Sequence, residues 1–322
     1  MGNKLFLLLI PFIVSCAAKK NDASNADTDG SDVKEVEVRF NSDSAYSYVE
    51  SQVEFGPRIS NTPAHRIAGN WLAGELHRHG AAVHIQETVL RSADGVDLQV
   101  KNIMGQFNPS SGDRLLLLAH WDTRPWADED PDERNRTKAP DGANDGASGV
   151  GVLLEIARIL GEIPSGRGVD ILFVDAEDRG VHNDDTSWAL GARYFANTPI
   201  FEGYVPSEVI LLDMVGAKNA CFAKEQFSMA NAPALLERVW RAATDAGYTE
   251  YFRNLPGGAV TDDHLSFLEQ GIPAIDIIDF RPDSDTGFAP GWHTMSDNMS
   301  LIDRSTLNAV GQTLLQFIYG KY

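Results

Sequence analysis

The sequence predicts an α/β fold: a three-layer sandwich with a central mixed, mostly parallel sheet flanked by helices. Two observations support this class. Short apolar runs alternate along the chain with segments whose apolar residues have helical spacing. A run of about four to eight apolar residues between turn signals is typical of a buried strand. Strands that alternate with helices favour a mostly parallel sheet with helices on both faces.

The helices are predicted from apolar spacing and from the residues at their ends. Thr62 is an N-cap residue type, Pro63 fits the first turn, and Gly80 can end the same helix. In residues 146–160, apolar residues recur at the spacing of one helix face. The full set of predicted helices is 45–55, 63–79, 146–160, 187–196, 234–246, 264–270 and 305–319.

The strands are predicted from apolar runs and turn signals. Residues 93–95, Ala-Asp-Gly, form a hairpin signal between the first two strands. Residues 123–141 are charged and contain proline, so we expect a long loop over the functional site. The predicted strands are 82–90, 96–107, 114–119, 168–174, 209–212 and 274–278.

Composition is ordinary for a soluble globular protein. The 322 residues are 43% hydrophobic and 23% charged, enough for one large domain or two small ones. The formal net charge of -19 argues against a nucleic-acid partner, because contacts to phosphate need clustered Lys and Arg.

The N-terminus has the pattern of an export signal. Lys4 precedes an apolar stretch, residues 5–14, that is too short to span a bilayer. The stretch ends at Ser15-Cys16, which resembles the lipobox of bacterial lipoproteins. That resemblance implies a signal peptide over residues 1–16, lipidation of Cys16 and attachment to a membrane. The alternative is a plain secretion signal with an incidental cysteine.

These features predict the organisation of the remaining chain. Residues 17–43 are rich in Asn, Asp, Ser and Ala, so we expect a flexible tether before a compact domain over 44–322. Lipidation of Cys16 would leave Cys221 alone, which excludes an intramolecular disulfide. We expect an exported lipoprotein of a Gram-negative-type bacterium, on the periplasmic side or the surface of the outer membrane.

Side chains of metal-binding types follow several of the predicted strands. Because parallel sheets gather their functional groups at the carboxyl ends of the strands, we expect these residues to converge. Carboxylates and imidazoles are zinc ligands, so together they predict a zinc hydrolase and nothing narrower. Taken singly, each residue is more often a helix cap or a core residue. They are His120 and Asp122 after 115–119, Asp145 within 142–146, Glu177 and Asp178 after 171–174, Asp213 after 209–212, and His293 within 291–294.

The order of these motifs resembles the zinc-dependent aminopeptidase superfamily. The closer resemblance, over about residues 44–322, is to glutaminyl-peptide cyclotransferases, or glutaminyl cyclases. Residues 211–217 resemble their Leu-Asp-hydrophobic-x-Gly-Ala segment, and Asp262-Asp263-His264 resembles their Asp-Asp-His segment. Residues 292–298 resemble their Trp-His-Thr-Met-Asp-Asp-Asn signature, whereas aminopeptidase relatives typically carry Tyr before that His.

The resemblance implies one zinc ion bound by Asp145, Asp178 and His293, with the fourth position open for catalysis. Glu177 would be the general base and acid. The implied reaction converts the N-terminal glutamine of peptides or proteins to pyroglutamate and releases ammonia. Asp262 and Asp213 would form a chain of hydrogen-bonded carboxylates with Glu177.

The resemblance also implies a small pocket around the glutamine side chain, with Trp292 and Trp188 as its walls. Two positions depart from the pattern. Asp178 stands where many relatives have Glu, so the metal or the backbone would sit differently. Asp276 stands where animal cyclases have a His that joins the acid network.

Two other functions stay open. The first is a two-zinc aminopeptidase, with His120 and Asp213 holding a second zinc, Asp145 bridging, and Asp122 orienting His120. The second is a non-catalytic peptide-binding lipoprotein on the same fold. The presence of the full ligand set argues against that second alternative.

Overall fold

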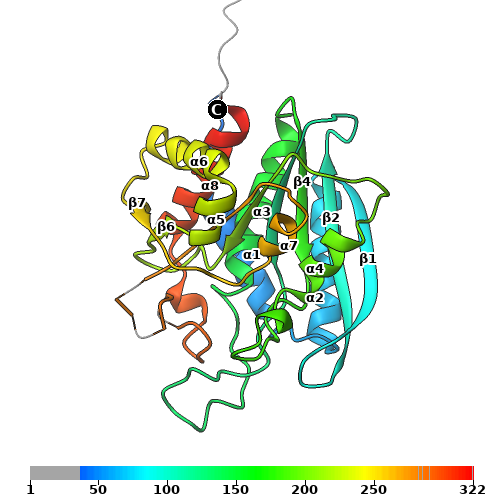
Figure 1. Cartoon of the computed structure of the whole chain (residues 1–322), viewed down its shortest axis with the longest axis vertical. Helices are drawn as coiled ribbons and strands as arrows, with labels where there is room; N and C mark the ends of the chain where they lie inside the picture. Colours follow the sequence, from blue (N-terminus) through cyan, green and yellow to red (C-terminus); the bar gives the residue numbers. More distant parts are fainter. Residues whose placement is uncertain (1–36, 282, 285, 290, 321) are drawn as a thin grey trace, which may run out of the picture. The chain divides into compact units, whose positions relative to one another are not determined.

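The computed structural model describes residues 37–281, 283–284, 286–289, 291–320 and 322. Residues from Val38 form one compact unit, in which β1, β2 and β4 lie side by side (Figure 1). Its six-stranded sheet has the strand order β1-β2-β4-β3-β5-β8. The outer strands β1 and β2 pair antiparallel, while β4, β3, β5 and β8 run parallel, so the predicted mixed sheet is confirmed. The strands are Ala82–Arg91 (β1), Asp97–Phe107 (β2), Arg114–His120 (β3), Gly168–Val174 (β4), Glu208–Asp213 (β5) and Ala274–Ile278 (β8).

Helices cover both faces of this sheet, which gives the three layers. One face packs against α1 (Ser42–Glu54), α2 (Pro63–Arg78), α3 (Ala147–Glu162) and α8 (Arg304–Tyr319), with α6 (Pro233–Asp245) beside α8. The opposite face packs against α4 (Leu190–Asn197) and α7 (Leu265–Leu268). Two 3-10 turns, Asp185–Ser187 and Met299–Leu301, lie in the connecting loops.

Strand β3 shows why these apolar runs become central strands. Leu115 and Leu117 lie in the core under α1, α2 and α3, while Leu116 and Leu118 lie in the core under α4 and α7. All four side chains are fully buried. Since burying one leucine contributes about 1.5–3 kcal/mol, a strand that is apolar on both faces is stable only between two helical layers.

The compact unit begins earlier than the sequence predicts. Phe40 is buried, and its ring lies so close to α8 that a Cβ on Gly311 would be 2.2 Å away. The Asn41 side chain accepts hydrogen bonds from the amides of Asp43 and Ser44 and so caps α1. The predicted tether is therefore wrong over residues 38–43, because one aromatic side chain and one N-cap attach that segment to the domain. Cys16 and the rest of residues 1–36 lie outside the described residues.

Three short elements were not predicted. They are β6 (Phe222–Lys224) and β7 (Phe252–Pro256), which form a separate two-stranded sheet, and α5 (Gln226–Asn231). Each mixes polar and apolar residues over six positions or fewer, as in Phe-Arg-Asn-Leu-Pro for β7, so neither an apolar run nor a helical spacing marks it. Within the described part of the chain, none of the helices has the length and apolar character needed to cross a membrane.

Candidate active site

Three adjacent parallel strands deliver acidic and imidazole side chains to one edge of the sheet. His120 is the last residue of β3, and Asp213 is the last residue of the neighbouring parallel strand β5. Glu177 and Asp178 follow β4 after Ala176, whose φ of 56° turns the chain sharply. The convergence predicted from strand order is therefore present.

Asp145 and His293 reach the same edge from loops. Asp145 precedes Gly146, the φ +94° residue at the start of α3, where a Cβ would lie 2.5 Å from the Asp122 carbonyl oxygen. His293 itself has a φ of 52°. Buried non-glycine residues with positive φ are uncommon, and such backbone strain tends to gather at functional sites.

The ligand atoms form two triads that share Asp145. In the first, His293 Nε2 lies 3.3 Å from Asp178 Oδ1 and 3.8 Å from Asp145 Oδ2. In the second, His120 Nε2 lies 3.0 Å from Asp145 Oδ1 and 3.3 Å from Asp213 Oδ1. Zinc bonds of about 2.0–2.2 Å at tetrahedral angles put neighbouring ligand atoms roughly 3.4 Å apart. Both triads therefore fit a zinc ion, and the donor types suit that metal.

The surroundings of His293 and His120 shift their pKa values in opposite directions. Burial, reinforced by the nearby charge of Arg124, lowers the pKa of His293 to about 3, so its imidazole is neutral and can bind a metal. Burial also opposes a charge on His120. There, however, the carboxylates of Asp122, Asp145 and Asp213 raise the pKa well above its usual range.

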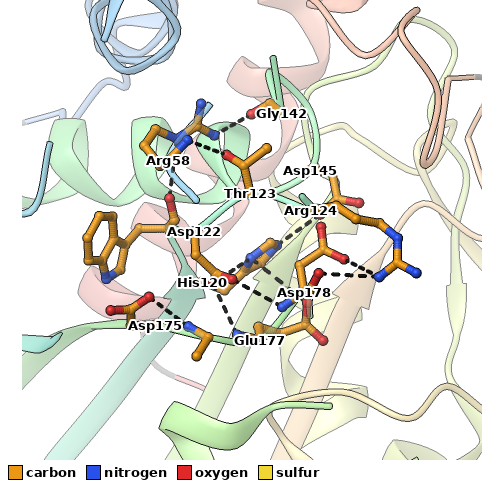
Figure 2. A network of polar contacts seen from close by, with 12 residues as sticks. Arg58, His120, Asp122, Thr123, Arg124, Gly142, Asp145, Asp175, Glu177 and Asp178 are labelled. Atoms are coloured by element: carbon orange, nitrogen blue, oxygen red, sulfur yellow. Dashed lines mark hydrogen bonds and ion pairs between the residues drawn. The ribbon is translucent and has the colours of Figure 1, made fainter. Parts of the chain in front are cut away.

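Two buried carboxylates hold the loops that carry the ligands. Asp122 accepts hydrogen bonds from the backbone amides of Glu177 and Asp178, at 3.1 and 3.2 Å (Figure 2). Asp297 accepts hydrogen bonds from the amides of Asn144 and Asp145, at 2.7 and 3.1 Å. Each carboxylate thereby fixes the backbone of a ligand, and Asp122 Oδ1 also lies 3.5 Å from His120 Nδ1. Since contacts behind metal ligands set their orientation, the site is held in place by its surroundings.

Arg58 also holds the loops that carry the ligands. Its buried guanidinium donates to the carbonyl oxygens of Trp121, Asp141 and Gly142, and its amide donates to the Thr123 hydroxyl (Figure 2). These bonds tie the loop after β3 to the loop before α3.

A pocket of about 180 Å³ opens over the first triad. Its walls include Trp188 and Trp292, whose rings lie 6.1 and 3.8 Å from the His293 ring, with interplanar angles of 13° and 22°. Val260, Ile278 and Phe288 add apolar surface. An apolar pocket with a few convergent polar groups is the usual form of a small-ligand site.

A group of buried carboxylates lies at the floor of this pocket and behind it. Burial raises the pKa of Glu177 well above its usual range, and Asp178 and Asp262 raise it further. Burial raises the pKa of Asp262 to about 7 and that of Asp213 to about 6. Carboxylates this close cannot all ionise, so the group retains protons near neutral pH.

The group extends to Asp263 and Asp276. Burial and the charge of Asp262 raise the pKa of both well above the usual range. The oxygens of both carboxylates lack a hydrogen-bond partner among the described residues. Asp276 therefore lies inside the acid group.

The structure brings together every site residue named from the sequence within its described part. Asp145, Asp178, His293 and Glu177 line the pocket, as do Asp213, Asp262, Trp188 and Trp292, and His120 contacts Asp145 and Asp213. Sequence reasoning did not find Arg58, Arg124, Asp128 and Asp297. Arg124 and Asp128 lie in the 123–141 loop, and its contact with the site is confirmed by a 3.1 Å hydrogen bond from the Glu129 amide to the His293 carbonyl.

Comparison with known proteins gives consistent results. The model of peptidase family M28 matches residues 102–318. A Zn-dependent exopeptidase from Parabacteroides distasonis is 51% identical with a TM-score of 0.87, covering 88% of this chain and 99% of that one. The glutaminyl cyclase of Bacteroides thetaiotaomicron is 48% identical with a TM-score of 0.86, again covering 88% and 99%.

A curated relative is more distant. Glutaminyl-peptide cyclotransferase from Bos taurus is 26% identical over 246 residues, which are 67% of this chain and 65% of the bovine protein. The matched region thus spans just under two thirds of that relative. The family match covers most of this chain, and the bacterial structures match over nearly their whole length. The chain belongs to peptidase family M28, in the group that contains the bacterial glutaminyl cyclases.

Proposed function

We propose that the chain cyclises the N-terminal glutamine of peptides or proteins to pyroglutamate and releases ammonia. The observation that carries this proposal is the small pocket, in which two tryptophans and Glu177 face the Asp145–Asp178–His293 triad. A zinc ion bound by that triad supplies Lewis-acid polarisation of the γ-amide carbonyl.

The residues of the chain account for the remaining chemistry. Trp188 and Trp292 hold the glutamine side chain so that its amide carbonyl carbon, Cδ, lies near the α-amine of the same residue, which is a proximity effect. The amine nitrogen bonds to this carbonyl carbon, Cδ, and the bond from Cδ to the amide nitrogen breaks. Glu177 takes a proton from the amine and returns it to the leaving ammonia. The raised pKa of Glu177 suits a group that must both accept and donate near neutral pH.

Glu177→Gln tests this role. The amide keeps the size of the side chain but cannot carry a proton, so we expect ammonia release from a Gln-initiated dipeptide to fall by roughly 10²- to 10⁴-fold. Zinc content should stay at the wild-type value. Glu87→Gln, at an exposed glutamate on β1, is the matched control. Undiminished ammonia release by the Glu177 variant would remove Glu177 from the mechanism.

A second function is favoured by the second triad, since His120, Asp145 and Asp213 match zinc spacing as well as the first triad does. This is the two-zinc aminopeptidase. We expect one zinc per chain and ammonia release. Two zinc ions per chain, together with release of free N-terminal residues from peptides, would establish the aminopeptidase instead. Bound zinc with neither product would indicate peptide binding alone.

We also propose that Cys16 is lipidated and that its lipid anchors the exported enzyme to a bacterial membrane, on the periplasmic side or the surface of the outer membrane. The support is the short apolar run that ends at Ser15-Cys16. Mass spectrometry of the N-terminal peptide from membranes tests the proposal. An acylated Cys16 at the mature N-terminus is expected, and an unmodified cysteine within a longer mature chain would contradict it.

A further inference from the structure

Arg124 is a buried cation at the edge of the candidate active site. It lies two residues after Asp122 in the loop that follows β3, and only 1% of the residue is exposed. A buried guanidinium must have its charge compensated and its N–H groups paired. The partners of the guanidinium therefore indicate which parts of the site Arg124 holds in place.

The guanidinium joins two carboxylates. Nε and Nη2 donate to the two oxygens of Asp128, at 2.7 and 2.5 Å. Nη1 donates to Asp178, at 3.3 Å to Oδ1 and 3.2 Å to the backbone carbonyl oxygen (Figure 2). A second carbonyl oxygen, that of Gly180, lies 3.4 Å from the same nitrogen. The planar fork thereby sets both the side chain and the backbone of Asp178.

Both of these carboxylates also face His293. Asp178 Oδ1 lies 3.3 Å from His293 Nε2, the nitrogen directed at the metal position. Asp128 Oδ1 lies 3.5 Å from the other ring nitrogen, Nδ1. Arg124 thus contacts the ligand Asp178 directly, and it contacts Asp128, which in turn faces the ligand His293. Carboxylates behind a ligating histidine fix the orientation of its ring.

The faces of the guanidinium contact two aromatic rings. Its carbon lies 5.3 Å from the centre of the Trp126 ring and 5.0 Å from that of Trp188. Trp188 is a wall of the pocket and also packs on Gly180, where a Cβ would lie 2.0 Å from the ring. A lysine ammonium cannot make the fork and the ring contacts together.

We propose that Arg124 is a positioning residue. It fixes the positions of the metal ligands Asp178 and His293 and of the pocket wall Trp188 relative to one another. Asp178 stands where many relatives have the longer Glu, and its Oδ1 lies 3.3 Å from Arg124 Nη1, so its position relative to the metal depends on Arg124. The zinc part of this inference is independent of the reaction, whereas the kinetic part rests on the proposed function.

The test compares Arg124→Lys and Asp128→Asn with the full wild-type chain. Zinc affinity is measured by competition with a chromogenic chelator, and folding of the zinc-free proteins by circular dichroism. Because losing a contact behind a metal ligand typically weakens binding, both variants should bind zinc roughly 10- to 100-fold more weakly. Asp128→Asn leaves the Trp188 contact in place, so only Arg124→Lys should also raise KM for a Gln-initiated dipeptide.

Arg179→Gln is the matched control. Its guanidinium carbon lies 5.4 Å from the Trp126 ring, and its nitrogens pair with Asp94 on the surface. It should bind zinc as the wild type does. Unchanged zinc affinity in folded Arg124→Lys or folded Asp128→Asn would overturn the inference, as would an equal loss in Arg179→Gln. A wild type that binds zinc tightly but releases no ammonia would overturn the proposed function and leave the zinc result standing.

Discussion

Gly149 in α3 offers a direct test of how the helix is fitted against the sheet. A Cβ at this position would lie 2.4 Å from the Leu212 carbonyl oxygen and 3.1 Å from the Ala119 Cβ. Contacts between non-bonded heavy atoms are favourable near roughly 3.5 Å, so Gly149→Ala would force α3 and β5 apart by about 1 Å. Both contacts adjoin site residues, since Ala119 precedes His120 and Leu212 precedes Asp213.

The expected magnitude follows from two opposing effects. Alanine is favoured over glycine in a helix interior by about 1 kcal/mol. Overpacking a core costs about 1–3 kcal/mol and can cost more against backbone, which moves less readily than a side chain. We therefore expect Gly149→Ala to lower the free energy of unfolding by about 1–2 kcal/mol. Zinc affinity should fall as well, because Asp145, two residues before α3, would be displaced from Asp178 and His293.

Gly74→Ala is the matched control, because Gly74 lies inside α2 and a Cβ added there would have open space around it, with nothing within 4 Å. It should stabilise the protein by about 0.5–1 kcal/mol. Denaturant unfolding of the zinc-free proteins, with midpoint and slope both fitted, measures the free energy of unfolding of each variant against the wild type. If Gly149→Ala proved as stable as Gly74→Ala, the close approach of α3 to β5 would not be a constraint on this fold.

Two further predictions concern metal removal and pH. Chelation should lower the thermal midpoint, and zinc should restore it, because a ligand present at 100 times its Kd stabilises by about 2.7 kcal/mol; an unchanged melting curve would contradict a structural contribution of the metal. Tyr319 donates to the Ile163 carbonyl oxygen, and burial raises its pKa to about 12. Since the unfolded chain loses this proton near about pH 10, the stabilisation is complete below that pH and is lost as pH rises through about 12. The stability difference between wild type and Tyr319→Phe, followed by denaturant unfolding, should shrink across that window; a difference independent of pH would show that the hydroxyl does not titrate with folding.

Much of the fold could be predicted from local pattern. The strands Gly168–Val174 and Ala274–Ile278 have their predicted bounds, because each is an apolar run between turn signals that only one aspartate, Asp170 or Asp276, interrupts. Thr62 caps α2 as predicted, with its hydroxyl oxygen accepting the His65 amide at 3.2 Å. Phe40 shows the opposite case. It ends residues 35–40, Glu-Val-Glu-Val-Arg-Phe, where charged and apolar residues alternate over too short a stretch to distinguish an ordered segment from a tether. Only its contact with α8 assigns it to the core.

The sequence by itself determined the chemistry of the site. Strand ends carry its acidic and imidazole side chains, and parallel strands place those ends along one edge, so Glu177, Asp178 and Asp213 had to meet His120. The tertiary structure alone decided how those groups are held. Arg58, Arg124 and Asp297 act through contacts across 54 to 153 residues of chain, and a contact over that separation leaves no local signal in the sequence.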